Sequence, residues 1–236
     1  MAKAPPRAPV AGPAFIRQLA RLTDAEIPLP TATLSDRLGH WVDWNRALVL
    51  SKALDGAIPV AAPETQAFDD DVAAECARAR TTLAESIQND PLPATKPHGS
   101  AAPAPCPEFA PFRQRHQHLQ RAILTATGRL RGRLRDMLAQ QSAEKARLAE
   151  VDAVMEMTLS PREQSLLARV PDLLGEHFAR LHARAPDVQA PPEAETPPAP
   201  APWLLAFHHD MRQVLLNELD VRFHPIEALL AALRTP

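Results

Sequence analysis

Tyrosine is absent from this 236-residue chain, and aromatic residues of all kinds make up only 4% of it. The interleaved aromatic side chains that accompany basic residues on many nucleic-acid-binding surfaces are therefore missing. Glycine is also scarce, and no two of the seven glycines fall in a loop that could cradle a phosphate group. This excludes the P-loop and the dinucleotide-binding fingerprint.

Cysteine, long apolar runs and net charge are limited too. Cys76 and Cys106 lack CxxC spacing and a nearby set of histidine ligands, which favours two reduced thiols over a disulfide. No uncharged stretch reaches the roughly 18 apolar residues that a membrane span needs. Residues 1–12 lack the apolar run of a signal peptide. The net charge of −2 favours neither nucleic acid nor an acidic membrane as partner, and we expect a cytoplasmic location.

Proline, by contrast, is abundant: its 26 residues are roughly double ordinary usage, and they cluster in spacers between apolar segments. Such spacers are expected to be extended, semi-rigid and without a fold of their own. The chain is accordingly divided into a disordered tail (1–12), an N-terminal helical region (13–88), a first linker (89–107), a central helical hairpin (108–185), a second linker (186–202) and a C-terminal helix that docks on the hairpin (203–236).

The central hairpin carries the strongest periodicity in the chain. Apolar or small residues recur every three or four positions, which predicts an amphipathic helix over 111–140. These positions are Phe112, His116, Leu119, Ile123, Ala126, Leu130, Leu134 and Met137. Ser142 is placed to cap a returning helix, and the sequence from Ser160 to Glu163 reads as a capping box with proline at the first helical position. With Pro171 kinking or ending a helix, we expect one long helix followed by two shorter ones.

The N-terminal region predicts three helices, over 13–22, over 33–54 and from Pro63 to Ile87. Trp41 and Trp44 are three residues apart, and we expect both in the core. The third of these helices is acidic and the long helix is basic, so the two are expected to be neighbours. The predicted fold is all-α: an elongated bundle of about six or seven helices built on the central hairpin, with Pro/Ala-rich disordered linkers.

Few motifs in the sequence could indicate catalysis or metal binding, and for each of them a structural role is favoured. The SxxK at Ser142 lacks the companion elements of serine acylases, so an N-cap is preferred. The GxxxG at Gly128 and Gly132 indicates close helix packing, and the acids at 69–71 suit the start of a helix better than a cation site. His208 and His209 diverge by about 100° on a helix and do not readily share one metal ion. We expect no catalytic residue, no cofactor and no metal.

Four arginines near the end of the long helix allow two interpretations. Arg129 and Arg133 share one face, and Arg131 and Arg135 share another, so two basic ridges flank the apolar stripe. These ridges could grip the phosphates of a nucleic acid. Pairing with acids on a partner helix is favoured, because no recognised nucleic-acid motif and no net basic charge accompany them.

The C-terminal helix presents a broad apolar face that includes Trp203, Phe207 and Met211. A face of this size is not expected to stay in water, and we predict that it packs on the hairpin with Asp210 and Glu218 facing arginines of the long helix. Together with the four arginines, these three residues are the candidate partner-binding positions.

Several stretches resemble an uncharacterised bacterial, all-helical family of unknown function. They are the segment Gly12 to Asp24, the segment Phe109 to Arg115, the segment Leu148 to Glu156 and the segment from Asp210 to Leu233. The family brings no established activity and no assigned site residues. The resemblance implies encoding beside proteins similar to peptidoglycan binders of the outer-membrane-protein-A type, and hence a cytoplasmic partner of an envelope-associated assembly.

The functional expectation is a non-enzymatic interaction or scaffold protein that acts through helix–helix contacts with protein partners. Binding of nucleic acid through the arginines of the long helix is the alternative, and an enzyme of unrecognised type ranks third. Homo-oligomerisation stays open at this stage, as does docking of the C-terminal helix within the chain or on another chain.

Overall fold

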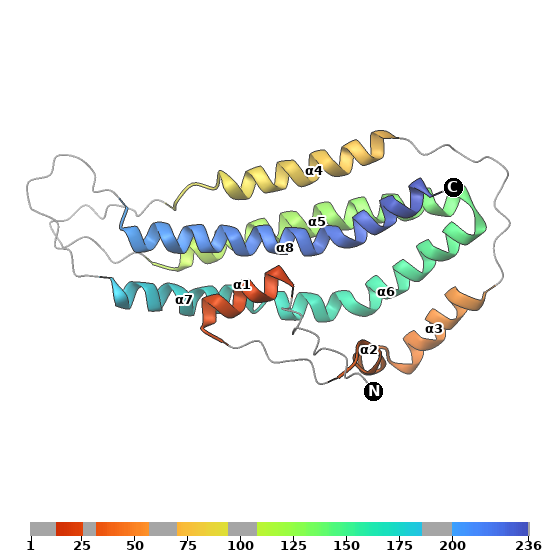
Figure 1. The fold of residues 1–236 in the computed structure, drawn as a ribbon, viewed down its shortest axis with the longest axis horizontal. Helices are drawn as coiled ribbons and strands as arrows, with labels where there is room; N and C mark the ends of the chain where they lie inside the picture. Colours follow the sequence, from red (N-terminus) through yellow and green to blue (C-terminus); the bar gives the residue numbers. More distant parts are fainter. Residues whose placement is uncertain (1–12, 26–31, 57–69, 94–107, 186–199, 236) are drawn as a thin grey trace, which may run out of the picture.

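The computed structural model describes residues 13–25, 32–56, 70–93, 108–185 and 200–235. These residues form eight helices and no strand, which confirms the all-α prediction (Figure 1). The tail at 1–12, Cys106 and the proline-rich segments at 94–107 and 186–199 lie outside the described residues.

The helix predicted over 33–54 is two helices, α2 (Leu34–Trp41) and α3 (Trp44–Asp55), which follow α1 (Ala14–Thr23). The chain turns at Val42, and the Asp43 side chain accepts a hydrogen bond from the Arg46 backbone N–H at 2.9 Å. An acidic cap of this kind stabilises a helix start by about 1 kcal/mol. The segment predicted as one helix therefore forms two.

This break also corrects the prediction that both tryptophans lie in the core. The Trp44 side chain is 77% exposed, because the turn at Val42 and Asp43 rotates it away from the bundle. The Trp41 ring is half-buried and lies under the Arg162 guanidinium, 4.9 Å from that group's central carbon. Of these two tryptophans, Trp41 therefore has its ring packed against the bundle, and Trp44 is largely exposed to water.

The long helix and its return are found as predicted. α5 (Ala110–Gln141) buries the stripe from Phe112 to Leu138, and the Ser142 hydroxyl accepts from the Lys145 N–H at 3.2 Å to start α6 (Ala143–Leu167). α4 (Asp70–Gln88) precedes this pair.

Two prolines lie inside helices without ending them. Pro161 lies inside α6, so the capping box predicted at Ser160 and Glu163 is wrong. The missing N–H leaves the Met157 carbonyl without its helical donor, and Pro161 is exposed, so water can take that place. Pro225 likewise lies inside α8 (Pro202–Arg234). Pro171 instead stands in the first turn of α7 (Val170–Arg184), as the prediction of a new helix there requires.

Helices α5 and α8 form the centre of the bundle and run parallel (Figure 1). Near their starts the Phe112 and Phe207 ring centroids are 5.2 Å apart, and near their far ends Lys145, just beyond α5, bonds the carbonyl of Thr235. α4 flanks this pair on one side and the α6–α7 arm flanks it on the other, both antiparallel to it. α1 packs against α7 and α8, and α3 packs against α6.

Two apolar clusters hold these helices together. One lies between α4, α5 and α8 and contains the fully buried Ile87, Ile123 and Leu219. The other joins α1, α7 and α8 around Phe207, whose ring meets the rings of Phe112 and Phe178 edge-on. Each fully buried Leu, Ile or Phe contributes roughly 1.5–3 kcal/mol to folding.

The glycines of the GxxxG motif do not mediate close packing. A Cβ atom at Gly128 or Gly132 would meet nothing within 4 Å, so the close approach predicted there is wrong. The acidic and basic helices do meet as expected: Glu75 of α4 pairs with Arg129, at 3.2 Å, and with Arg133. Further along α4, Arg80 pairs with Asp220 of α8 at 2.7 Å.

The described part of the first predicted linker is packed against the bundle. The carboxylate of Asp90 is fully buried, where it pairs with Arg115 of α5 and lies 3.4 Å from His208 Nε2 of α8. Asp90 therefore connects the end of α4 to both central helices.

Candidate functional site

An apolar groove of ≈ 440 Å³ lies between α1, the α6–α7 junction and α8. Its apolar lining consists of Phe15, Ile16, Leu19, Leu166, Leu167, Val170, Leu173 and Val221. The side chains of Ile16 and Leu166 are 42% and 58% exposed, so two large apolar residues from different helices face water side by side. The charged side chains of Glu163, Arg169 and Arg222 also border the groove. The groove thus combines an apolar lining with convergent charged groups, as ligand-binding and partner-binding sites commonly do.

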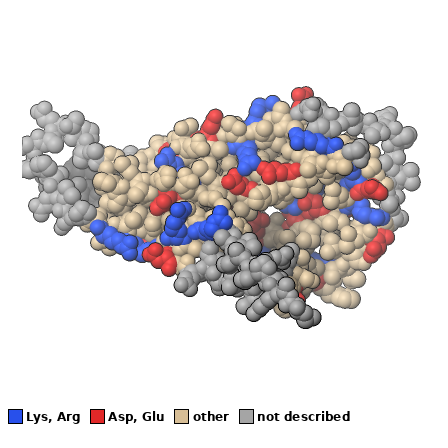
Figure 2. Space-filling view, in the orientation of Figure 1, with Lys and Arg blue, Asp and Glu red and all other residues tan. Residues whose placement is uncertain are grey.

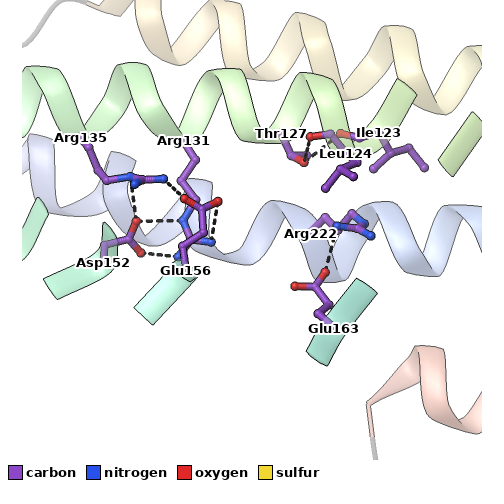
Figure 3. A network of polar contacts seen from close by, with 9 residues as sticks. All are labelled: Ile123, Leu124, Thr127, Arg131, Arg135, Asp152, Glu156, Glu163 and Arg222. Atoms are coloured by element: carbon purple, nitrogen blue, oxygen red, sulfur yellow. Dashed lines mark hydrogen bonds and ion pairs between the residues drawn. The ribbon is translucent and has the colours of Figure 1, made fainter. Parts of the chain in front are cut away.

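A buried ion pair forms the base of this groove. Glu218 of α8 is 1% exposed, accepts a hydrogen bond from Gln120 Nε2 at 2.8 Å, and pairs with Arg222 Nε at 3.0 Å. The Arg222 side chain is 8% exposed and holds a second carboxylate, that of Glu163, at 3.0 Å (Figure 3). A buried carboxylate is tolerated only when it is paired and hydrogen-bonded in this way. The base of the groove is thus polar and fixed in geometry.

A second hollow of ≈ 370 Å³ borders the same junction. Leu167 and Arg222 line both hollows, so the start of α7 and the buried pair lie between them. The amide side chains of Gln117, Gln120 and Gln164 give this second hollow a more polar lining. The two-residue turn at Ala168 and Arg169 separates an apolar groove from this more polar hollow.

The four arginines predicted as partner-binding residues are all held in ion pairs within the chain. The Arg131 guanidinium grips Asp152 with two bonds of 2.7 and 2.8 Å, and Arg135 pairs with Asp152 at 3.2 Å and with Glu156 (Figure 3). On the opposite side, Arg129 and Arg133 share the carboxylate of Glu75, as described above. One ridge thus binds α6 and the other binds α4.

The three C-terminal candidates lie in the aromatic cluster. Phe207 and Met211 are fully buried. Trp203 is half-buried and packs edge-on against Phe178 and His182, with ring centroids 5.2 and 5.1 Å away. Asp210 and Glu218 do not face arginines of α5, because Asp210 bonds His177 of α7 at 2.9 Å and Glu218 pairs within α8.

Two histidines are buried without a catalytic arrangement around them. Burial lowers the pKa of His116 to about 4, an effect that the neighbouring Gln120 amide opposes, and neither ring nitrogen makes a hydrogen bond. Burial also lowers the pKa of His208, although Asp90 beside it opposes the shift. His209, the next residue, is exposed, as a divergence of about 100° requires. Both buried imidazoles are neutral near neutral pH.

No group of three or more His, Cys, Asp or Glu side chains within the described ranges is placed to hold a metal ion. Asp69 and the side chain of Asp70 fall outside those ranges, and Glu75 of the same acidic segment is taken by two arginines. The Cys76 thiol is buried and free, and burial raises its pKa. None of the described helices is long and apolar enough to cross a membrane.

Reasoning from the sequence missed the groove and its base. Gln120 was not singled out, and the pairing of Glu218 with Arg222 was not anticipated. A signal was present for the last two, because a carboxylate and a guanidinium four residues apart interrupt the apolar face of a long helix.

Comparison with known proteins gives the family of the chain. No curated protein and no solved structure matches it. One family model, described as "Protein of unknown function (DUF3348)", matches residues 1–235. The match covers nearly the whole sequence, including every described helix, and the resemblance inferred from short segments is confirmed. The chain therefore belongs to the DUF3348 family of proteins of unknown function.

Proposed function

We propose that this protein is a non-enzymatic interaction protein that receives an amphipathic helix of a protein partner in the groove between α1, the α6–α7 junction and α8. The observation that carries the proposal is the exposed pair Ile16 and Leu166 beside a buried, fixed ion pair. A helix laid in such a groove buries its apolar face, while the charged rim at Glu163 and Arg169 offers partners for its polar edge.

The same structure weakens the support for nucleic-acid binding. A guanidinium that already holds a carboxylate must break that pair before it can bind a phosphate group. Arg129, Arg131, Arg133 and Arg135 each hold one. On the face drawn in Figure 2, basic and acidic side chains are interspersed and form no large patch of one sign. We therefore propose a protein partner.

The proposed setting is the cytoplasmic side of an envelope-associated assembly. This part rests on the family resemblance and on the two cysteines without disulfide spacing, both drawn from the sequence. A second copy of the chain is the other occupant that the groove could accept, and the experiment below separates the two.

The test is photo-crosslinking in living cells with benzoylphenylalanine at Leu166. The matched control is Met157, which is 55% exposed on the same helix but does not line the groove. We expect a crosslinked product at Leu166 and none at Met157, and we expect Ile16→Asp to abolish it because a charge at that position opposes burial.

The mass of the product identifies the occupant. A product of twice the chain mass indicates a second copy, and any other mass indicates a foreign partner. Equal crosslinking at Leu166 and Met157, or a product that survives Ile16→Asp, would show that the groove is not the binding surface.

A further inference from the structure

A polar cavity of ≈ 320 Å³ lies on the molecule where the end of α1 meets α7 and α8. Three arginines line it, Arg21 from α1 and Arg180 and Arg184 from α7. His177 and His209 line it as well, so cationic or proton-binding side chains arrive from three helices. The proposed partner groove uses none of these residues.

These three arginines are bonded differently from nine others in the described chain. Within the described chain, none of the three holds a carboxylate: Arg21 donates to the Gln18 side chain, and Arg180 donates to the backbone carbonyl of Leu22. Arg184 is exposed and has no bonded partner there. The arginines that do hold a carboxylate are Arg46, Arg80, Arg113, Arg115, Arg129, Arg131, Arg133, Arg135 and Arg222. Three guanidinium groups without a bonded carboxylate therefore meet at this cavity.

The side chains of Arg21 and Arg180 are held by hydrogen bonds that leave other N–H groups of each guanidinium free to bind a ligand. Gln18 is only 5% exposed, and its side-chain oxygen orients Arg21. A guanidinium has five N–H donors, so Arg180 keeps four after binding the Leu22 carbonyl. That bond also satisfies one carbonyl at the C-terminal end of α1, whose partial negative charge would otherwise disfavour an anion.

The end of α1 is held in an uncommon backbone conformation at the same place. Asp24, which lines the cavity, has φ of 50°, in the left-handed region that a non-glycine residue rarely adopts. Its N–H and that of Ala25 both bond the carbonyl of Ala20, which ends the helix sharply. Many helices end with one residue in this region, and here the cap fixes the direction in which the chain leaves α1 beside the cavity.

The charged side chains that line the cavity indicate which class of ligand it could bind. Two carboxylates line the cavity, but Asp210 is taken by His177 at 2.9 Å and Asp24 is exposed. Three guanidinium groups against these two acids leave one positive charge in excess, before any histidine is protonated. We propose that this cavity binds the phosphate group of a small molecule through Arg21, Arg180 and Arg184. Arginine is suited to this role because its planar fork matches two phosphate oxygens at once.

The proposal is tested on the full chain by isothermal titration calorimetry at neutral pH in a chloride buffer. The probes are inorganic phosphate, pyrophosphate and ribose 5-phosphate, with succinate as a dianion of similar charge that lacks phosphorus. Saturable binding of at least one phosphate probe, tighter than that of succinate, is expected. The arginine Nε–Hε signals in ¹H–¹⁵N NMR spectra locate the site: those of Arg21, Arg180 and Arg184 shift on titration, and that of Arg131 stays in place.

Arg184→Gln is the decisive variant, because Arg184 has no bonded partner in the described chain and its loss leaves the folding contacts intact. It should weaken binding about tenfold or more, which corresponds to one charge-assisted hydrogen bond. Arg78→Gln is the control, since Arg78 is exposed on α4 and lies away from the cavity. Absence of saturable binding at millimolar probe, equal affinity for succinate, or an equal loss in both variants would overturn the proposal.

Discussion

Replacing Glu218 by leucine removes the carboxylate at the base of the groove and leaves the guanidinium of Arg222 buried with only one acid. Glu218 is 1% exposed and Arg222 is 8% exposed, so the interaction between them is shielded from water. Breaking a buried pair by removing one partner costs about 3–5 kcal/mol of stability. Arg222 keeps Glu163 at 3.0 Å, which places the expected loss near the lower end, about 3 kcal/mol.

The double replacement Glu218→Leu with Arg222→Met has a different expected result. Replacing a whole buried ion pair by apolar groups of similar volume is often neutral, so this variant should lie within about 1 kcal/mol of the original chain. Urea unfolding followed by far-ultraviolet circular dichroism measures both variants. With a slope of roughly 3 kcal/mol per molar urea, the single variant should lower the midpoint by about 1 M.

Asp220→Asn is the control for this experiment, because Asp220 pairs with Arg80 but is 54% exposed. An exposed pair contributes about 0–1 kcal/mol, so its midpoint should scarcely move. The reasoning is refuted if Glu218→Leu lowers stability no more than Asp220→Asn does, or if the double variant is destabilised as much as Glu218→Leu alone.

Three further outcomes follow from the core. Phe207→Ala should lower stability by about 3–5 kcal/mol, since the ring is fully buried among other rings; urea unfolding measures it, and a loss below about 1 kcal/mol would contradict the packing. The pKa of His116 is lowered to about 4 in the folded chain, whereas a histidine in the unfolded chain has a pKa of ~6.5. Between these two values the unfolded chain therefore binds one proton more than the folded chain. The free energy of unfolding should consequently fall by about 3 kcal/mol as the pH falls from ~6.5 to ~4. His116→Leu should remove that part of the acid sensitivity, and an unchanged pH profile of the urea midpoint would count against it. Deleting 203–236 removes a central helix, so the remaining chain should lose cooperative unfolding in calorimetry; a preserved melting transition would disprove the central role of α8.

Features set by neighbouring residues were predictable from the sequence. The 3–4 spacing of α5 and the capping hydroxyl of Ser142 act within one or two helical turns, and both are found in the structure. The all-α class follows from the same local periodicity.

Predictions from local sequence patterns were wrong where two patterns favoured different helix ends. At Val42 the apolar periodicity continues, but the cap at Asp43 wins and the helix ends. At Ser160 the capping sequence is present, yet α6 continues because Pro161 faces water. The spacing of Gly128 and Gly132 is that of closely packed helices, although nothing approaches them. Periodicity alone does not reveal which neighbour, if any, a face will meet.

The groove and the polar cavity depend on which helices meet, and the local patterns of a single sequence do not reveal those contacts. Ile16 and Leu166 are 150 residues apart in the chain, and they adjoin only because α1 packs on α7 and α8. Arg21 and Arg180 are brought together in the same way. The pairing of Glu218 with Arg222 could have been noticed, since both lie on one helix.

The packing of Trp203 gives the protein its own optical reporter. The chain has three tryptophans and no tyrosine, so excitation in the near ultraviolet reaches the indole rings with little competition. Of the three, only Trp203 lies against Phe178 and His182 of α7. It stands in the first turn of α8, directly after the second proline-rich segment. With Trp41 and Trp44 replaced by phenylalanine, all indole emission comes from that junction. Separation of α7 from α8 then shifts the emission to longer wavelength as the ring enters water, and the docking of these two helices becomes visible in real time without an added dye.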